Sequence, residues 1–174
     1  MSKPVLKIAF IPFDAFGHVN SCLGMARNLR ERGHNCVFIA NQNWKDLITK
    51  HGFHCEVYIE EHKLGDKGSW SDWMIEHGHT FKLSPFEKLR QFEAPVWPTA
   101  TLDVKLFNDK IKQIITDLKP EAIVCDSFLS IPAVVNAGVP WIDLCSCHPL
   151  FYFADDRLPP GISGQTQIQK DIRH

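Results

Sequence analysis

The chain has 174 residues, which is enough for one domain of the commonest size with a hydrophobic core of its own. Its formal net charge is -1, so it has no excess of basic residues with which to bind nucleic acid or an anionic membrane surface. We therefore expect small-molecule partners, with no nucleic acid and no membrane among them.

The first part of the chain predicts a strand, a turn and a helix. Residues 6–12 (LKIAFIP) are a nearly continuous apolar run, which is typical of a parallel strand covered on both faces. After a sharp turn at Gly17, apolar residues recur at helical spacing from Val19 until Gly33, which suits a helix C-terminal cap. His18 lies where strand gives way to helix, and ligands gather at such strand ends in open α/β sheets. It is either a general base or an ordinary solvated loop histidine.

The remaining sequence repeats the alternation of strands and helices. Further strands are predicted at residues 34–40, 53–59, 122–125 and 141–146, and further helices after a cap at Asn43, from Thr101 to the residue before Pro120, and from about Pro132. Residues 60–100 are rich in Gly, Pro, Trp and Phe, which indicates a long functional excursion with short helices of its own. This order favours an α/β fold, a Rossmann-like parallel sheet with helices on both faces.

The common phosphate-binding loops do not occur in the sequence. There is neither the G-x-G-x-x-G fingerprint of dinucleotide sites nor the G-x-x-x-x-G-K-[ST] loop of nucleoside triphosphatases. We therefore expect no bound cofactor. Cys145, Cys147 and His148 stand close together but lack the second ligand pair of a structural zinc site, so no metal is expected either.

The predicted topology brings two distant residues together. In a doubly wound sheet the first and fourth strands are neighbours, and their carboxyl ends open on the same edge. Those ends carry His18 and Asp126. A carboxylate beside an imidazole fixes its tautomer and stabilises the imidazolium that forms when the other nitrogen takes a proton. Alternatively, Asp126 caps the helix that follows, a position that aspartate favours.

Three segments of the chain resemble one known family. The opening KIAFIPFDAFGHVNSCLGMARNLRERGHNCVFIA and the later LKPEAIVCDSF and AGVPWIDLCSCHPL are similar, in this order, to UDP-glycosyltransferases of the GT-B fold, which include plant, bacterial and arthropod enzymes that act on small molecules. The resemblance implies an inverting transfer of a sugar from a UDP-sugar to a hydroxyl of a small, largely apolar acceptor. By position, it implies that His18 deprotonates the acceptor and that Asp126 is its partner.

Six further residues are expected around the reacting groups. Aromatic side chains line most ligand sites, and four are expected to line the acceptor pocket: Phe16, Phe128, Phe92 and Trp97. Gly17 and Asn20 are expected nearest the donor. Many members of the family have proline two residues after the histidine, where this chain has Asn20, so the diphosphate contact at this turn stays open.

The resemblance implies that residues 1–174 are the N-terminal, acceptor-binding domain of such an enzyme. The family's second Rossmann-like domain, which binds most of the UDP-sugar, has no counterpart in the sequence, so we expect a truncated protein that is inactive on its own. One alternative is a stand-alone protein that holds apolar hydroxylated molecules in the same pocket. Another is a different α/β enzyme such as a hydrolase, which the lack of a G-x-S-x-G motif disfavours.

The sequence predicts a cytoplasmic protein. The first apolar run is too short for a signal peptide and Asp14 follows it at once. No segment approaches the ~20 apolar residues of a membrane-spanning helix. The six cysteines lie mostly within apolar patterns, as reduced structural thiols do.

Overall fold

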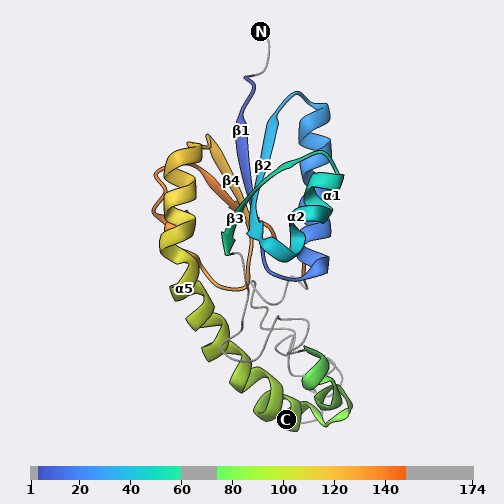
Figure 1. Cartoon of the computed structure of the whole chain (residues 1–174). Coiled ribbons are helices and arrows are strands. Elements are labelled where there is room, and N and C mark those ends of the chain that lie inside the picture. Colours follow the sequence, from blue (N-terminus) through green and yellow to red (C-terminus); the bar gives the residue numbers. More distant parts are fainter. Residues whose placement is uncertain (1–3, 60–73, 148–174) are drawn as a thin grey trace, which may run out of the picture.

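The computed structural model describes residues 4–59 and 74–147, and a parallel sheet forms their centre (Figure 1). Within these residues the strands are β1 (Lys7–Pro12), β2 (Asn35–Asn41), β3 (His54–Ile59), β4 (Ala122–Asp126) and β5 (Trp141–Asp143). They are ordered β3-β2-β1-β4-β5, and every neighbouring pair is parallel. The predicted parallel α/β sheet is therefore confirmed.

Helices cover both faces of the sheet. The helical elements are α1 (Phe16–Glu31), α2 (Gln42–Lys50), η1 (Gly78–Lys82), α4 (Pro85–Lys88), η2 (Leu89–Glu93), α5 (Ala94–Leu118) and α6 (Pro132–Val135). In Figure 1, α1 and α2 lie on one side of the strands and α5 lies on the other. Alternate residues of β1 point to opposite faces of the sheet. Phe10 packs with residues of α1 and α2 on one face, and Ile11 packs with residues of α5 and α6 on the other. The strands are thus buried on both faces, which explains their apolar composition.

The pairing of β1 with β4 positions the candidate site. Residue by residue, Ile11 pairs with Cys125 and Pro12 with Asp126, so both strands end at the same level of the sheet. Just beyond that level, the backbone N–H of Phe13 donates to the carbonyl of Asp126 over 2.6 Å. The start of α1 is therefore held against the end of β4, as the switch-point argument predicts.

Two local predictions at helix ends are wrong. Asn41, not Asn43, caps α2, because its side-chain oxygen accepts a hydrogen bond from the backbone N–H of Asn43 over 3.0 Å. Gly17 does not make the turn before α1, since it lies in the helix itself, and a Cβ there would meet nothing within 4 Å. Gly33, by contrast, follows the C-cap of α1 with φ +92°, a conformation that favours glycine as predicted.

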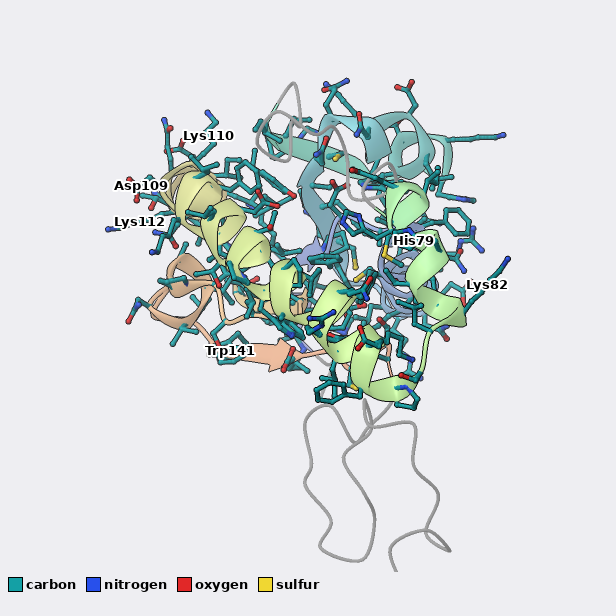
Figure 2. The ribbon with its side chains drawn as sticks, turned by 90° about the horizontal axis from the view of Figure 1, so that it is seen from below. His79, Lys82, Asp109, Lys110, Lys112 and Trp141 are labelled. Carbon is teal, nitrogen blue, oxygen red and sulfur yellow. The ribbon has the colours of Figure 1, made fainter. Side chains whose placement is uncertain are left out.

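The long helix begins earlier than its sequence indicates. Residues from Thr101 onward were expected to be helical because prolines break helices, yet α5 begins at Ala94 and extends past the edge of the sheet (Figure 1). Pro95 lies in the first turn, where no backbone N–H is required. Pro98 lies inside the helix, which α5 tolerates near its start. In the view from below, Asp109, Lys110 and Lys112 project from the outer face of α5 (Figure 2).

The edge strand β5 is shorter than predicted. It covers Trp141–Asp143, where residues 141–146 were expected, and all three residues are exposed. Figure 2 shows Trp141 at this open edge. Across residues 4–59 and 74–147, no helix has both the length and the apolar character to cross a lipid bilayer.

Four of the cysteines are buried free thiols, as their apolar surroundings predicted: Cys22, Cys36, Cys55 and Cys125. Burial raises the pKa of the Cys55 thiol to about 11 and that of Cys125 to about 12. These thiols are protonated at neutral pH and serve as small apolar core groups.

Candidate active site

The structure brings His18 and Asp126 into contact. His18 lies in the first turn of α1 and Asp126 is the last residue of β4; the two are 8% and 1% exposed. The imidazole Nδ1 is 2.8 Å from the carboxylate Oδ1. The alternative role of Asp126 as a helix cap is wrong, because the next helix, α6, begins at Pro132 with Ile131 as its N-cap.

The carboxylate sets the orientation of the ring. An ionised aspartate only accepts hydrogen bonds, so Nδ1–H of His18 donates to Asp126 and Nε2 is left as the acceptor. Two aromatic rings hold the imidazole from the sides: the centroids of Phe13 and Phe128 lie 5.2 Å and 5.0 Å from that of His18. The pair is thus fixed in one geometry with one basic nitrogen available.

Sequence reasoning missed Ser146, which joins this pair. Its hydroxyl donates to Asp126 Oδ1 over 3.0 Å and also lies 3.1 Å from His18 Nδ1. The residue comes just after β5, where the backbone N–H of Leu144 still bonds to the carbonyl of Cys125 over 2.7 Å. The only signal in the sequence was its place as the last residue of a predicted strand that ends at the same edge of the sheet.

A cysteine lies on the other side of the ring. The Sγ of Cys147 is 3.9 Å from Nε2 of His18. Burial raises the pKa of this thiol, so it is a neutral S–H group that can donate weakly to Nε2. Of the suggested Cys145, Cys147 and His148 cluster, His148 lies outside the described residues. In the part of the chain that is described, no three His, Cys, Asp or Glu side chains gather as metal ligands do.

An apolar cavity of about 520 Å³ opens beside His18. Eleven described residues line it: Phe13, Ala15, His18, Met74, Ile75, Phe92, Glu93, Val96, Trp97, Ala100 and Phe128. Apart from His18 and Glu93, they contribute apolar or aromatic side chains. This volume and lining are those of a site for a drug-sized organic molecule.

Three of the four aromatic residues that were expected in the acceptor pocket do line this cavity: Phe92, Trp97 and Phe128. Phe16 does not; its side chain is 62% exposed, with its ring 6.3 Å from that of Trp44. Phe16 precedes His18 by two residues of α1, which turns it by roughly 200° around the helix axis, away from the cavity. Gly17 and Asn20 are exposed at the start of α1 and do not line the cavity.

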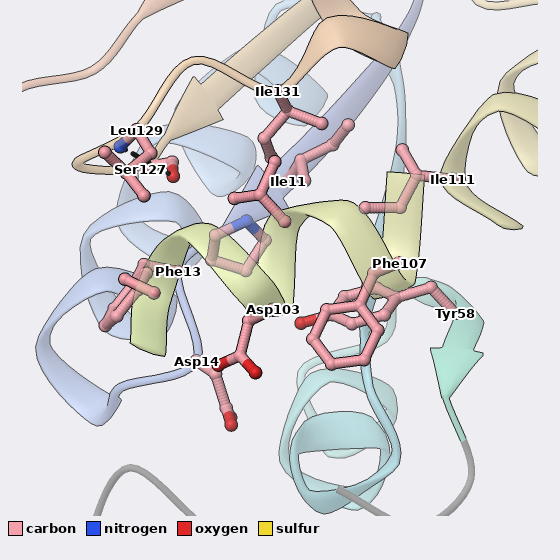
Figure 3. A pocket seen from close by; sticks show the side chains of 13 residues that line it. Ile11, Phe13, Asp14, Tyr58, Asp103, Phe107, Ile111, Ser127, Leu129 and Ile131 are labelled. Atoms are coloured by element: carbon pink, nitrogen blue, oxygen red, sulfur yellow. Dashed lines mark hydrogen bonds between the residues drawn. The ribbon is translucent and has the colours of Figure 1, made fainter. Parts of the chain in front are cut away.

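A second, much smaller hollow of about 50 Å³ is drawn in Figure 3, and it shares the lining residues Phe13 and Ala100 with the first. Figure 3 shows Asp14 and Asp103 side by side at its border, with Tyr58 and Phe107 nearby. Asp14 Oδ1 accepts a hydrogen bond from the indole N–H of Trp44 over 2.5 Å. Burial raises the pKa of the Tyr58 phenol, with the charges of Asp14 and Asp103 adding to the effect, so the phenol is neutral.

Comparisons with known proteins agree on the fold. No protein-family model and no curated protein matches the sequence. Among solved structures, the glycosyltransferase SsfS6 of Streptomyces sp. SF2575 matches with a TM-score of 0.60 and 18% identity, over 79% of this chain and 38% of that one. SnogD, a glycosyltransferase from Streptomyces nogalater, matches with a TM-score of 0.57 and 10% identity, over 81% and 36%.

The matches show which fold the chain has and how much of the matched proteins it spans. SsfS6 has also been solved with thymidine diphosphate, and that structure matches with a TM-score of 0.51 and 16% identity, over 79% of this chain and 38% of that one. The chain therefore has the fold of one domain of the GT-B glycosyltransferases, as the resemblance of its sequence implied. It spans less than two fifths of the length of these proteins.

Proposed function

We propose that the chain is the acceptor-binding domain of an inverting glycosyltransferase that uses a nucleoside-diphosphate sugar. One observation carries the proposal: His18 lines an apolar cavity while its Nδ1 is bonded to the buried carboxylate of Asp126. A small apolar molecule in that cavity presents its hydroxyl to Nε2 of an oriented imidazole. The fold shared with glycosyltransferases supports the same role.

The proposed reaction follows from the orientation of the ring. The acceptor hydroxyl donates its proton to Nε2 of His18 as its oxygen attacks the anomeric carbon of the sugar. The bond from that carbon to the diphosphate oxygen breaks on the opposite face, and its electron pair leaves with the diphosphate. Asp126 stabilises the imidazolium that forms. Ser146 holds Asp126 Oδ1 and so keeps the carboxylate aimed at Nδ1.

The neighbours of His18 argue against hydrolysis by a nucleophilic side chain. A serine nucleophile must bond to the nitrogen that is not held by the aspartate. Here Ser146 lies on the Asp126 side of the ring. Cys147 is on the Nε2 side, but its pKa is raised by burial, whereas a nucleophilic cysteine requires a lowered one. Deprotonation of a bound hydroxyl fits these contacts better.

The donor belongs to a second part of the proposed enzyme. In our proposal a separate nucleotide-binding domain supplies most contacts to the donor, and a UDP-sugar is the expected substrate. The thymidine diphosphate bound to SsfS6 makes a TDP-sugar the natural comparator. The compartment in which we place this reaction is the cytoplasm.

Binding and transfer together test the proposal. Calorimetry on the 174-residue chain should detect 4-propylphenol and scarcely any UDP. With a nucleotide-binding domain present, mass spectrometry should detect glucosylated phenol from UDP-glucose, with TDP-glucose as the comparison donor. Micromolar UDP binding by this chain would contradict the division of labour between the domains. A failure of the chain to bind any phenol would contradict the acceptor site.

A further inference from the structure

We propose that the cavity beside His18 selects acceptors that carry a protonated amine as well as a hydroxyl, and that Glu93 binds the amine. This inference rests on the proposed function, in which that cavity receives the acceptor. It adds the chemical class of the acceptor, an aromatic or aliphatic body with a cationic nitrogen. It also assigns Glu93 as a specificity-determining residue.

Glu93 is the only carboxylate among the described residues that line the cavity. The other lining residues are apolar or aromatic, apart from His18. Glu93 is partly buried, and its side-chain carboxylate makes no hydrogen bond or ion pair with any residue in the described ranges 4–59 and 74–147. A carboxylate in an apolar wall loses hydration, and a partner must replace what is lost. The cavity itself is the space from which that partner can come.

The backbone beside Glu93 is irregular. Residues Leu89–Glu93 form a single π-helical turn between α4 and α5. The backbone N–H of Ala94 donates to the carbonyl of Leu89, five residues earlier, which is the wider spacing of a π turn. Single π turns inside helices occur often at functional sites. Here the turn ends at Glu93, the acidic residue among the described part of the cavity wall.

The charges and rings around Glu93 favour a cation. Burial raises the pKa of its carboxyl group, and Lys88 lowers it by a smaller amount. A protonated amine in the cavity would restore the lost hydration energy with a charge-assisted hydrogen bond. Phe92, Trp97 and Phe128 line the same cavity, and the faces of aromatic rings attract cations. An anionic ligand would face the carboxylate with like charge, which selects against it.

A matched series of phenols tests this on the chain itself. Tyramine carries an ammonium group where 4-propylphenol carries a methyl group, and 3-(4-hydroxyphenyl)propionate carries a carboxylate. By calorimetry at pH 7, we expect tyramine to bind about 10-fold more tightly than 4-propylphenol, and the propionate to bind most weakly. Glu93→Gln should remove the preference for tyramine over 4-propylphenol.

Two further variants sharpen the result. Glu87→Gln removes the same charge from an exposed residue of the adjoining α4 that does not line the cavity, so it should retain the preference for tyramine. Glu93→Lys should reverse the preference toward 3-(4-hydroxyphenyl)propionate. Circular dichroism establishes that each variant is folded.

The outcomes separate this inference from the proposed function. If 4-propylphenol binds to the wild-type chain but tyramine binds no more tightly, the acceptor site stands and the role of Glu93 is wrong. A preference for tyramine that persists in Glu93→Gln overturns the role of Glu93 as well. If none of the three phenols binds, the acceptor site itself is wrong, and the inference falls with it.

Discussion

Two hollows lie side by side at the carboxyl edge of this sheet, and they differ in chemistry. The larger measures about 520 Å³, and the described residues that line it are apolar or aromatic except His18 and Glu93. The smaller measures about 50 Å³ and is bordered by Asp14 and Asp103 (Figure 3). Phe13 and Ala100 line both. A position at the strand ends therefore does not by itself make a ligand site.

The two hollows differ in their volume and in the hydrogen bonds of the residues that border them. Small-molecule sites usually enclose about 300–1,000 Å³, whereas 50 Å³ has room for little more than water. Asp14 also accepts hydrogen bonds from Trp44 and from the side-chain amide of Asn41. Its carboxylate thus holds α2 and the end of β2 against the turn before α1. We therefore assign the residues around the smaller hollow a structural role, and we assign acceptor binding to the larger cavity.

The largest expected effect concerns the base in the larger cavity. In an enzyme form that carries the nucleotide-binding domain, His18→Ala should lower kcat for a hydroxyl acceptor by about 10²–10⁴-fold, the range for a lost general base. Acceptor binding should change little, because aromatic and aliphatic groups supply most of the cavity wall. Steady-state kinetics with calorimetry measure both quantities. Near-normal turnover would reduce His18 to a structural residue.

Asp126 should act only through His18. Asp126→Asn keeps the shape of the side chain but removes the charge that stabilises the imidazolium, so kcat should fall by roughly 10²-fold or more. In a His18→Ala background most of that loss should disappear, because residues that act as a unit are not additive. A double-mutant cycle on kcat, with a melting curve for each variant, makes the measurement. Losses that simply multiply would argue against the pair.

Aromatic truncations should distinguish the two hollows directly. Phe107 borders the smaller hollow, is 8% exposed and has its ring centroid 5.2 Å from that of Tyr58, so Phe107→Ala should lower the free energy of unfolding by about 3–5 kcal/mol. Its affinity for 4-propylphenol should stay the same. Trp97→Ala should instead weaken that affinity by about 10-fold through lost apolar contact. Denaturant unfolding and calorimetry test both, and an equal loss of affinity in the two variants would erase the distinction.

Ser146 should have a smaller effect of its own. Its hydroxyl donates one hydrogen bond to the carboxylate of Asp126. Ser146→Ala should therefore lower kcat by about 2–10-fold and leave KM unchanged. Ser146→Thr retains the hydroxyl and should restore the rate. A change in KM without a change in kcat would place Ser146 in substrate binding rather than in positioning the pair.

The central fold and the His18–Asp126 pair could be predicted because both follow from pattern and topology. The apolar runs of β1 and β4 mark strands buried on both faces, and parallel neighbours must end at one edge. Residues that follow the ends of those two strands are therefore close together, and His18 Nδ1 does contact Asp126 Oδ1. The activity that we assign to the pair stays a proposal.

Other features depend on geometry that the sequence does not display. Phe16 was wrongly expected in the pocket because it lies in α1, two residues before His18. Residues two positions apart in a helix point to nearly opposite sides, so Phe16 points away when His18 faces the cavity. The early start of α5 was missed because Pro95 and Pro98 resemble breaks, although a first turn needs no N–H groups. Ser146 donates to Asp126 from the segment that follows β5, and the sequence does not display where that segment leads.

The smallest expected effect is on stability, and its sign depends on pH. Burial raises the pKa of Glu93 in the folded state, so the folded chain holds this proton more tightly than the unfolded chain. The stabilising contribution is present below the unfolded pKa and is lost as the pH rises through the folded one. At pH 7 the ionised carboxylate opposes folding, and Glu93→Gln should raise the melting temperature. The difference from wild type should shrink on acidification to about pH 4, where the carboxyl group approaches protonation in both states.

Glu87 supplies a control of opposite sign for that melting experiment. Hydrogen bonding to Gln91 and the charge of Arg90 lower the pKa of the exposed Glu87, so its ionised form favours folding above the unfolded pKa. Glu87→Gln should therefore lower the melting temperature slightly at pH 7, where Glu93→Gln raises it. Scanning calorimetry of both variants at pH 7 and pH 4 makes the comparison. A lower melting temperature for Glu93→Gln at pH 7 would mean that its carboxylate is already stabilised within the protein, and a ligand cation would then have nothing to restore.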